Sequence, residues 1–430
     1  MIEAFKKAVA GGDVGEARRL LETSVEVRGA VNAPLFAFDQ RPVSRAAKDF
    51  GMVDLLLEFG ADLNLKSEWW AGGWGILETA EPELAEELIK RGAVVDVFAA
   101  AHLDKIDRLR ELLDADPELV HAKGGDGCRA LHFARSKEAM DLLLSRGAEI
   151  DARDVDHEGT AAQWAVPRAD GSRDDKWRED LQRVRWLVER GATVDIFMAA
   201  VLGDSGLLRK VMAGDPGAAD VVLGETDYAL CPKAPGEHIY TYRFTGGMTP
   251  YQVAMEFGNP ACAEILLESA TPRQRFLAAC SVGDEGAARA VLVARPGVLG
   301  ELTGKDRHVL AHAAWAGRVA AVMLMLDMGI DPAVKGPGES TALHRAAWRG
   351  HHAVVRTILT HPVAKGRLKE LVSAVEASFK ATPLGWCYHG STNCGNPAGD
   401  YAAIARMLLE AGAEREDASG ASEAVRAAVG

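Results

Sequence analysis

Five similar segments recur along the chain, and each is an apolar helical run that ends in Gly-Ala. They are LLLEFGADLN (55–64), LIKRGAVVD (88–96), LLLSRGAEID (142–151), LVERGATVD (187–195) and LLEAGAE (408–414). A glycine at this position can take the left-handed conformation that ends a helix. The recurrence predicts a repeat architecture, in which each helix pair buries its apolar face only against its neighbours.

A second pattern marks where the paired helices begin. Its copies are STALHRAAWRGHHAVV (340–355), RALHFA (129–134), MTPYQVAMEFGN (248–259) and ATPLGW (381–386). With the Gly-Ala ends, these segments resemble the ankyrin repeat, a unit of about 33 residues that starts with T-P-L-H-x-A. The resemblance implies an all-α solenoid of about twelve helix pairs with short finger loops. One continuous array would occupy residues 1–415, followed by a C-terminal tail at 416–430 that is either a last frayed helix or a disordered end.

Three insertions are expected to interrupt this array. The charged segment 167–182 has a helical pattern and is expected to extend its helix pair. Segment 224–247 carries Tyr240, Tyr242 and Phe244 in a strand-like alternation. Segment 389–400 is rich in turn-forming residues. The last two insertions could form a lid over the inner face of the array.

The composition of the chain restricts its expected cellular compartment and its expected binding partners. The net charge of −13 repels phosphate backbones, which argues against nucleic-acid binding. The longest apolar run, Val319 to Leu326, is too short to span a bilayer, and the N-terminus does not read as a signal peptide. Six scattered cysteines do not form a disulfide framework. We therefore expect a cytoplasmic protein without a membrane anchor, and the abundance of Ala, Gly and Arg suggests a bacterial source.

Ligand-facing positions follow from the ankyrin resemblance. It implies that the residue after T-P-L-H and the one three positions later face the concave side, and residues three apart share one helical face. In the last three units these pairs are His312 with Trp315, Arg345 with Trp348, and Trp386 with His389. Neighbouring helices pack about 10 Å apart, so the six side chains are expected to form one patch. Alternatively, the tryptophans pack on neighbouring helices or under the inserted residues 390–400.

The same register assigns further residues to the concave face of earlier units. At the first position it places Glu78, Phe133 and Trp164. The inner surface would then be an apolar and aromatic trough with an acid at one end. Such a surface suits a protein segment or an apolar small molecule.

Several other motifs have structural interpretations. His132 and His344 match the repeat's own histidine and are expected to tie each unit together. The loop DVDHEGT (154–160) is interpreted as a solvated turn and not a metal site. The stretch from Cys387 to Cys394 has no fourth zinc ligand, so no metal or cofactor is expected. The three glycines of WWAGGWGILE (69–78) have no explanation in the repeat pattern.

Two functional hypotheses follow. The first is a scaffold that binds a protein, a peptide or an apolar small molecule on its concave face, because this kind of fold supplies recognition and not chemistry. The second is an enzyme of cyclase, isomerase or hydrolase type, in which His312 and His389 transfer protons and Arg345 holds an anion. The clustering of His, Arg and Trp in three units favours the enzyme, whereas the repeat fold itself favours the scaffold.

Overall fold

The structure is a computed structural model that describes residues 1–169, 173–221, 223, 237–244, 248–268, 270–304, 306–396 and 398–430. These residues form helices joined by turns and loops, and their β pairing is limited to two isolated bridges, Arg153–Thr160 and Lys335–Thr341. The prediction of an all-α fold is therefore confirmed. The chain divides into two compact units, which are described separately below.

The first unit comprises Met1–Arg168, Ser172–Thr193 and Pro232–Tyr240. Its α-helices are α1 (Ile2–Gly11), α2 (Val14–Thr23), α3 (Val25–Gly29), α4 (Pro42–Arg45), α5 (Phe50–Glu58), α6 (Pro82–Lys90), α7 (Val97–His102), α8 (Ile106–Ala115), α9 (Ala130–Phe133), α10 (Lys137–Ser145), α11 (Ala161–Trp164), α12 (Asp175–Glu189) and most of α15 (Glu237–Thr241). Short 3-10 turns add η1 (Ala37–Asp39), η2 (Pro117–His121) and η3 (Gly125–Gly127).

The second unit comprises Ala169–Gly171, Val194–Cys231 and Thr241–Gly430. Its α-helices are α13 (Ile196–Leu202), α14 (Ser205–Gly214), α16 (Pro250–Glu256), α17 (Pro260–Glu268), α18 (Pro272–Val282), α19 (Glu285–Ala294), α20 (Val298–Glu301), α21 (His308–Trp315), α22 (Val319–Asp327), α23 (Ala342–Trp348), α24 (His352–Thr360), α25 (Leu368–Val372), α26 (Pro383–Asn393), α27 (Tyr401–Glu410) and α28 (Glu423–Val429). The 3-10 turns are η4 (Ala218–Asp220), η6 (Pro337–Glu339) and η7 (Pro362–Ala364).

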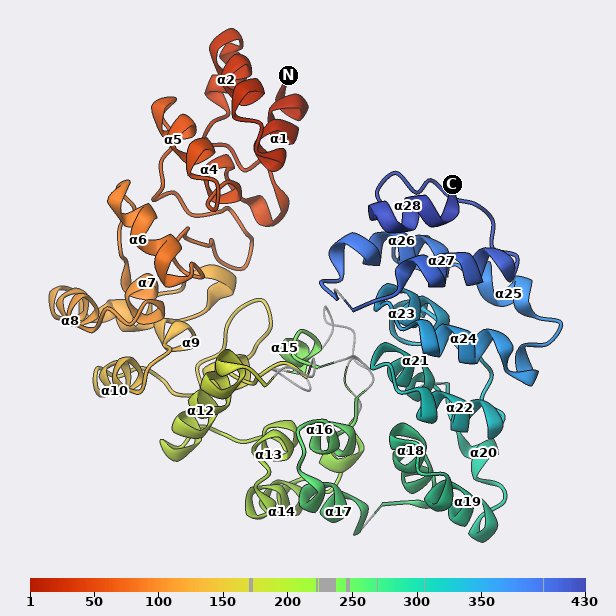
Figure 1. The fold of residues 1–430 in the computed structure, drawn as a ribbon. Coiled ribbons are helices and arrows are strands. Elements are labelled where there is room, and N and C mark those ends of the chain that lie inside the picture. The colour runs from red at the N-terminus through yellow and green to blue at the C-terminus, as the bar shows by residue number, and fades with distance from the viewer. Residues whose placement is uncertain are drawn as a thin grey trace. The chain divides into compact units, whose positions relative to one another are not determined.

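Helix pairs stack side by side within the second unit. Along one side α18, α21, α23 and α26 follow one another, and α22, α24 and α27 form the opposite row (Figure 1). A continuous core runs between the two rows from Phe276 to Val429. The first unit has a comparable core from Phe5 to Ala99. Stacked pairs agree with a solenoid, while the extension of one array of about twelve pairs over residues 1–415 stays a prediction.

The five Gly-Ala ends behave as the sequence predicts. Their glycines, at positions 60, 92, 147, 191 and 412, have φ angles between 87° and 103°. Two asparagine side chains then form hydrogen bonds between neighbouring repeats. Asn32 Nδ2 donates to the carbonyl of Gly60, and Asn64 Nδ2 donates to the carbonyl of Gly92. The glycine turn therefore ends a helix and also presents a carbonyl to the preceding repeat.

The insertions differ in part from their predictions. Segment 167–182 contains the start of α12, as expected, with 170–172 outside the described residues. The strand-like alternation is wrong at 237–241, because these residues form α15; residues 224–236 and 245–247 lie outside the described residues. In segment 389–400, α26 continues to Asn393, so turns begin only after it.

The C-terminal tail is folded. Residues 423–429 form α28, whose Val425 and Val429 are buried in the core of the second unit. Asp417 and Ser419 form a turn before this helix. Among the described helices, none is both long and apolar enough to cross a bilayer.

Candidate functional site

The predicted pairs of the last three units lie on consecutive helices of the second unit. His312 and Trp315 are on α21, Arg345 and Trp348 are on α23, and Trp386 and His389 are on α26. The ring centroid of Trp348 lies 5.8 Å from that of Trp386 and 5.3 Å from that of His389. The structure therefore joins Trp348, Trp386 and His389 into one aromatic cluster.

Trp315 forms a second cluster with two arginines. The guanidinium carbon of Arg345 lies 5.4 Å from the Trp315 ring centroid, and that of Arg349 lies 5.3 Å from it. Both distances are typical of cation–π contacts. Arg345 Nε also donates to Ser340 Oγ at 2.9 Å. We call Trp315, Arg345, Trp348, Arg349, Trp386 and His389 the arginine–tryptophan surface.

Burial gives Arg345 unusual electrostatics. Desolvation lowers the pKa of its guanidinium to about 10. The guanidinium is still charged at neutral pH. Its lowered pKa therefore reflects the free energy needed to keep a cation largely shielded from water. A bound anion would reduce this cost.

His312 does not lie on the surface. Its side chain is only 3% exposed, and neither ring nitrogen has a hydrogen-bond partner among the described residues. Burial, with smaller contributions from Arg318 and Arg345, lowers the pKa of His312 to about 3. The imidazole is therefore neutral at pH 7. Arg318 itself donates to the carbonyl of Ser281 and pairs with Glu256.

His389, by contrast, is exposed and stacks on Trp348. Its Nδ1 lies 3.4 Å from the amide nitrogen of Asn393, one helical turn later. The two histidines proposed for proton transfer thus differ sharply in environment, one buried and uncharged and the other solvated.

The structural histidines behave as predicted. His344 Nδ1 accepts from the backbone N–H of Thr341 at 3.2 Å, and its Nε2 donates to the carbonyl of Ala381 at 3.2 Å. His132 makes the equivalent bonds, its Nε2 donating to Gly159 at 3.1 Å. Each ring therefore links the start of its own helix to the next repeat.

Comparison with known families supports the repeat assignment. Residues 308–359 match the family model described as "Ankyrin repeats (many copies)". The chain contains ankyrin repeats. The matched ankyrin segment spans α21 to α24 and includes four of the predicted surface positions, His312, Trp315, Arg345 and Trp348. A search of curated proteins found no match to the chain.

The three predicted ligand positions of the first unit have internal partners. Glu78 is buried, pairs with Lys66 Nζ at 2.6 Å and accepts from the backbone N–H of Gly125 at 3.0 Å. Phe133 packs between Trp74 and Phe98, at centroid distances of 5.9 and 5.7 Å. Trp164 donates its indole N–H to Asp154 at 2.8 Å. A ligand-binding role for Glu78, Phe133 and Trp164 stays a prediction.

The loop 154–160 is not the solvated turn that the sequence suggested. Asp154 and His157 are 3% and 7% exposed. Burial alone would raise the pKa of Asp154, but hydrogen bonds from His157 and Trp164 lower it below its usual value. Asp154 is buried because neighbouring finger loops pack on it, a contact between distant segments that local polarity does not reveal.

Three indoles hold these loops together. Trp69 donates to Asp156 at 3.3 Å, Trp74 donates to Asp126 at 2.9 Å, and Trp164 donates to Asp154. Two groups here have donor atoms close enough for a metal ion, Cys128–His132–Asp154 and Asp126–Asp156–His157. Since His132 already uses both ring nitrogens and the three aspartates accept from indoles, we interpret both groups as loop packing.

The same packing explains Gly72, and close backbone within its own loop explains Gly73. A Cβ on Gly72 would lie 2.2 Å from the carbonyl oxygen of Gly124, and Gly72 has a φ of +152°. On Gly73 it would lie 2.1 Å from the carbonyl oxygen of Ser67. A Cβ on Gly125 would lie 2.2 Å from the ring of Trp74. The second glycine-rich stretch, GGDG at 124–127, was the signal in the sequence that the two loops interlock.

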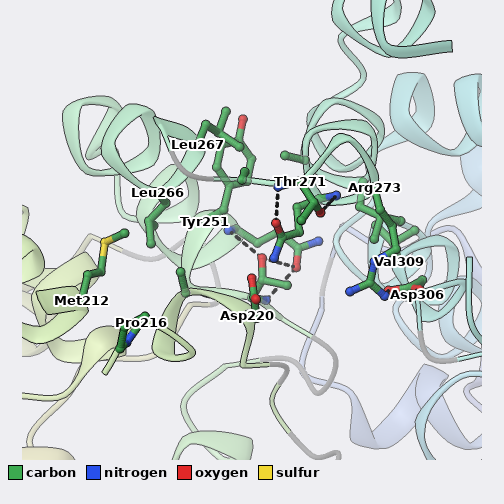
Figure 2. A pocket seen from close by; sticks show the side chains of 17 residues that line it. Met212, Pro216, Asp220, Tyr251, Leu266, Leu267, Thr271, Arg273, Asp306 and Val309 are labelled. Carbon is green, nitrogen blue, oxygen red and sulfur yellow. Dashed lines mark hydrogen bonds and ion pairs between the residues drawn. The ribbon is translucent and has the colours of Figure 1, made fainter. Parts of the chain in front are cut away.

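A cavity in the second unit was missed by the sequence interpretation. It has a volume of about 390 Å³ and lies where α16 and α17 meet α18 (Figure 2). Only residues 269–271 link α17 to α18, whereas 14 residues, 328–341, separate α22 from α23. With no finger loop in this link, the space between the two helix pairs is not filled. The sequence signal was the outer-helix segment PACAEILLE followed almost directly by TPRQ.

Proposed function

We propose that the C-terminal ankyrin repeats bind an acidic segment of a partner protein at the arginine–tryptophan surface. Ankyrin repeats generally serve as protein-interaction scaffolds. The observation that carries the proposal is the placement of two guanidinium groups, Arg345 and Arg349, on the single indole of Trp315. A stacked guanidinium is held in a fixed orientation and its N–H edge suits a carboxylate.

Two further features support an anionic ligand. Burial of Arg345 makes its charge costly, and a carboxylate would offset that cost. Arg349 places a second positive charge on the same indole. The adjacent cluster of Trp348, Trp386 and His389 provides apolar area for the rest of the segment, as is common at interface anchors.

Binding is favoured over the enzymatic alternative by the state of His312. A pKa of about 3 leaves almost no protonated imidazole at pH 7, whereas a general acid or base works best with a pKa near the working pH. The proton-transfer roles of His312 and His389 therefore receive less support than recognition.

The test uses the full chain and two fluorescein-labelled peptides, one alternating Glu with Leu and the other alternating Lys with Leu. Fluorescence anisotropy is expected to show binding of the acidic peptide, weakened by salt. Arg345→Met should weaken it at least about tenfold. Arg356→Met, at an exposed position of α24, is the matched control and should have no effect. Equal affinity for the two peptides, or unchanged binding by Arg345→Met, would contradict the proposal.

A further inference from the structure

The cavity between α17 and α18 is lined by both apolar and polar residues. Its apolar walls include Met212, Leu266, Leu267, Leu277 and Val309. Figure 2 shows Met212 and Pro216 at one end and Arg273 and Asp306 at the other. Ligand sites in proteins have volumes of about 300–1,000 Å³, mostly apolar linings and a few polar groups. The cavity of about 390 Å³ falls within that range.

Charge at the polar end is already balanced. Arg273 Nη1 lies 3.0 and 2.8 Å from the two carboxylate oxygens of Asp306. Asp306 also accepts from the backbone N–H and the hydroxyl of Thr303, at 2.7 and 2.8 Å. A charged head group would find its counter-ion occupied at this end, and burying it without a partner is costly. The other carboxylate of the lining, Asp220, is exposed to solvent.

Two glutamines supply hydrogen-bond donors to the cavity. Gln252 Oε1 accepts from the backbone N–H of Thr249 at 2.8 Å, and Gln274 Oε1 accepts from that of Thr271 at 2.5 Å. These capping boxes start α16 and α18 and use the oxygen of each amide. Gln252 is 3% exposed, and its Nε2 donates to no acceptor among the described residues.

Tyr251 contributes its aromatic ring to the lining. Burial raises the pKa of its phenol, with a smaller contribution from Asp284. Tyr251 and Asp284 also line a neighbouring hollow, and Figure 2 shows the hydroxyl of Tyr251 directed away from Asp220. The two glutamine amides therefore present N–H donors beside the apolar walls, which selects a ligand that accepts hydrogen bonds.

We propose that this cavity binds an uncharged small molecule with an apolar body and a carbonyl oxygen that accepts from Gln252. The apolar body lies toward Met212 and Leu266, and the oxygen lies at the glutamine amides. A ketone, ester or amide of medium chain length has this chemistry. The site is separate from the arginine–tryptophan surface and shares no residue with it.

The experiment compares three probes of equal chain length, 2-octanone, octanoate and octylammonium, on the full chain labelled with [methyl-13C]methionine. Binding is followed from the methyl resonance of Met212, which the Met212→Leu variant identifies among the 11 methionines. We expect 2-octanone to shift this resonance and to bind at least about tenfold more tightly than either ion.

Two variants test the assignment. Gln252→Glu keeps the oxygen that caps α16, because Glu also serves in capping boxes, but it removes the N–H donors. It should weaken 2-octanone binding at least about tenfold. Gln163→Glu makes the same change in the capping box of α11, which does not line the cavity, and should have no effect. Ala270→Trp, in the link at the cavity wall, should abolish binding by filling the space.

The outcomes divide clearly. Preference for 2-octanone, lost in both Gln252→Glu and Ala270→Trp, supports the proposal. Similar affinity for all three probes, no shift at Met212, or full 2-octanone binding by Gln252→Glu would overturn it.

Discussion

His312 is buried although its ring nitrogens have no hydrogen-bond partner among the described residues, whereas buried polar groups usually have one. A buried imidazole without hydrogen bonds loses the solvation it has in the unfolded chain. His344, equally deep in the same unit, donates to Ala381 and accepts from Thr341. Two histidines of the same array therefore differ in what they contribute to stability.

We predict that His312→Leu is more stable than the wild type, and that its advantage grows as the pH falls. The pKa of His312 is about 3 in the folded protein and about 6.5 in the unfolded chain. Between these values the unfolded chain binds a proton that the folded protein does not. The free energy of unfolding of the wild type therefore falls on acidification, by about 1.4 kcal/mol per pH unit for this residue.

Urea denaturation at pH about 8 and about 5 measures this difference. His344→Leu is the comparison, since it removes two hydrogen bonds and should lose about 2 kcal/mol at the higher pH. If His312→Leu were destabilised as much as His344→Leu, the imidazole of His312 would have partners in solution that the structure does not contain.

At the scale of elements, local signals predicted helix ends well and loop packing poorly. The Gly-Ala ends were predictable because a left-handed glycine is a property of a few adjacent residues. The burial of Asp154 and His157 was not, because it depends on Trp164 and on loops far away in sequence. The alternation at Tyr240 and Tyr242 suggested a strand, but no neighbouring strand exists among the described residues to pair with it, and 237–241 form a helix.

We predict that Gly72→Ala costs far more stability than Gly60→Ala. Both glycines have positive φ, so both variants pay about 1 kcal/mol for the backbone. Only at Gly72 would the new methyl group collide with backbone, the carbonyl oxygen of Gly124. We expect a loss of about 3 kcal/mol or more at Gly72, measured by chemical denaturation. Equal losses would show that the two loops separate at little cost.

At the scale of the whole molecule, stability comes from neighbour contacts, so the ends of a stack matter. In the second unit α28 covers the last helix pair, with Val425 fully buried. The sequence left open whether 416–430 is ordered, because its pattern is short and weakly apolar. The candidate surface was predicted from the repeat register alone, and most of its residues lie together in the structure. The cavity was not predicted, because it results from the absence of a finger loop between α17 and α18.

We predict that Val425→Asp destabilises the second unit by about 2–4 kcal/mol, because it buries a carboxylate without a partner. Val25→Asp, at a residue that is 76% exposed, is the control and should change stability by less than about 0.5 kcal/mol. Hydrogen exchange is expected to rise first in α27 and α28, which are in contact. Unchanged protection of α27 would mean that α28 does not cap the stack.

The distribution of tryptophans between the units has a practical consequence. Six of the nine indoles belong to the first unit, and the three in the second unit are Trp315, Trp348 and Trp386. All tryptophan fluorescence of the second unit thus originates at the arginine–tryptophan surface. Replacing the other six with phenylalanine would turn the emission spectrum into a label-free reporter that responds to a ligand at that surface alone.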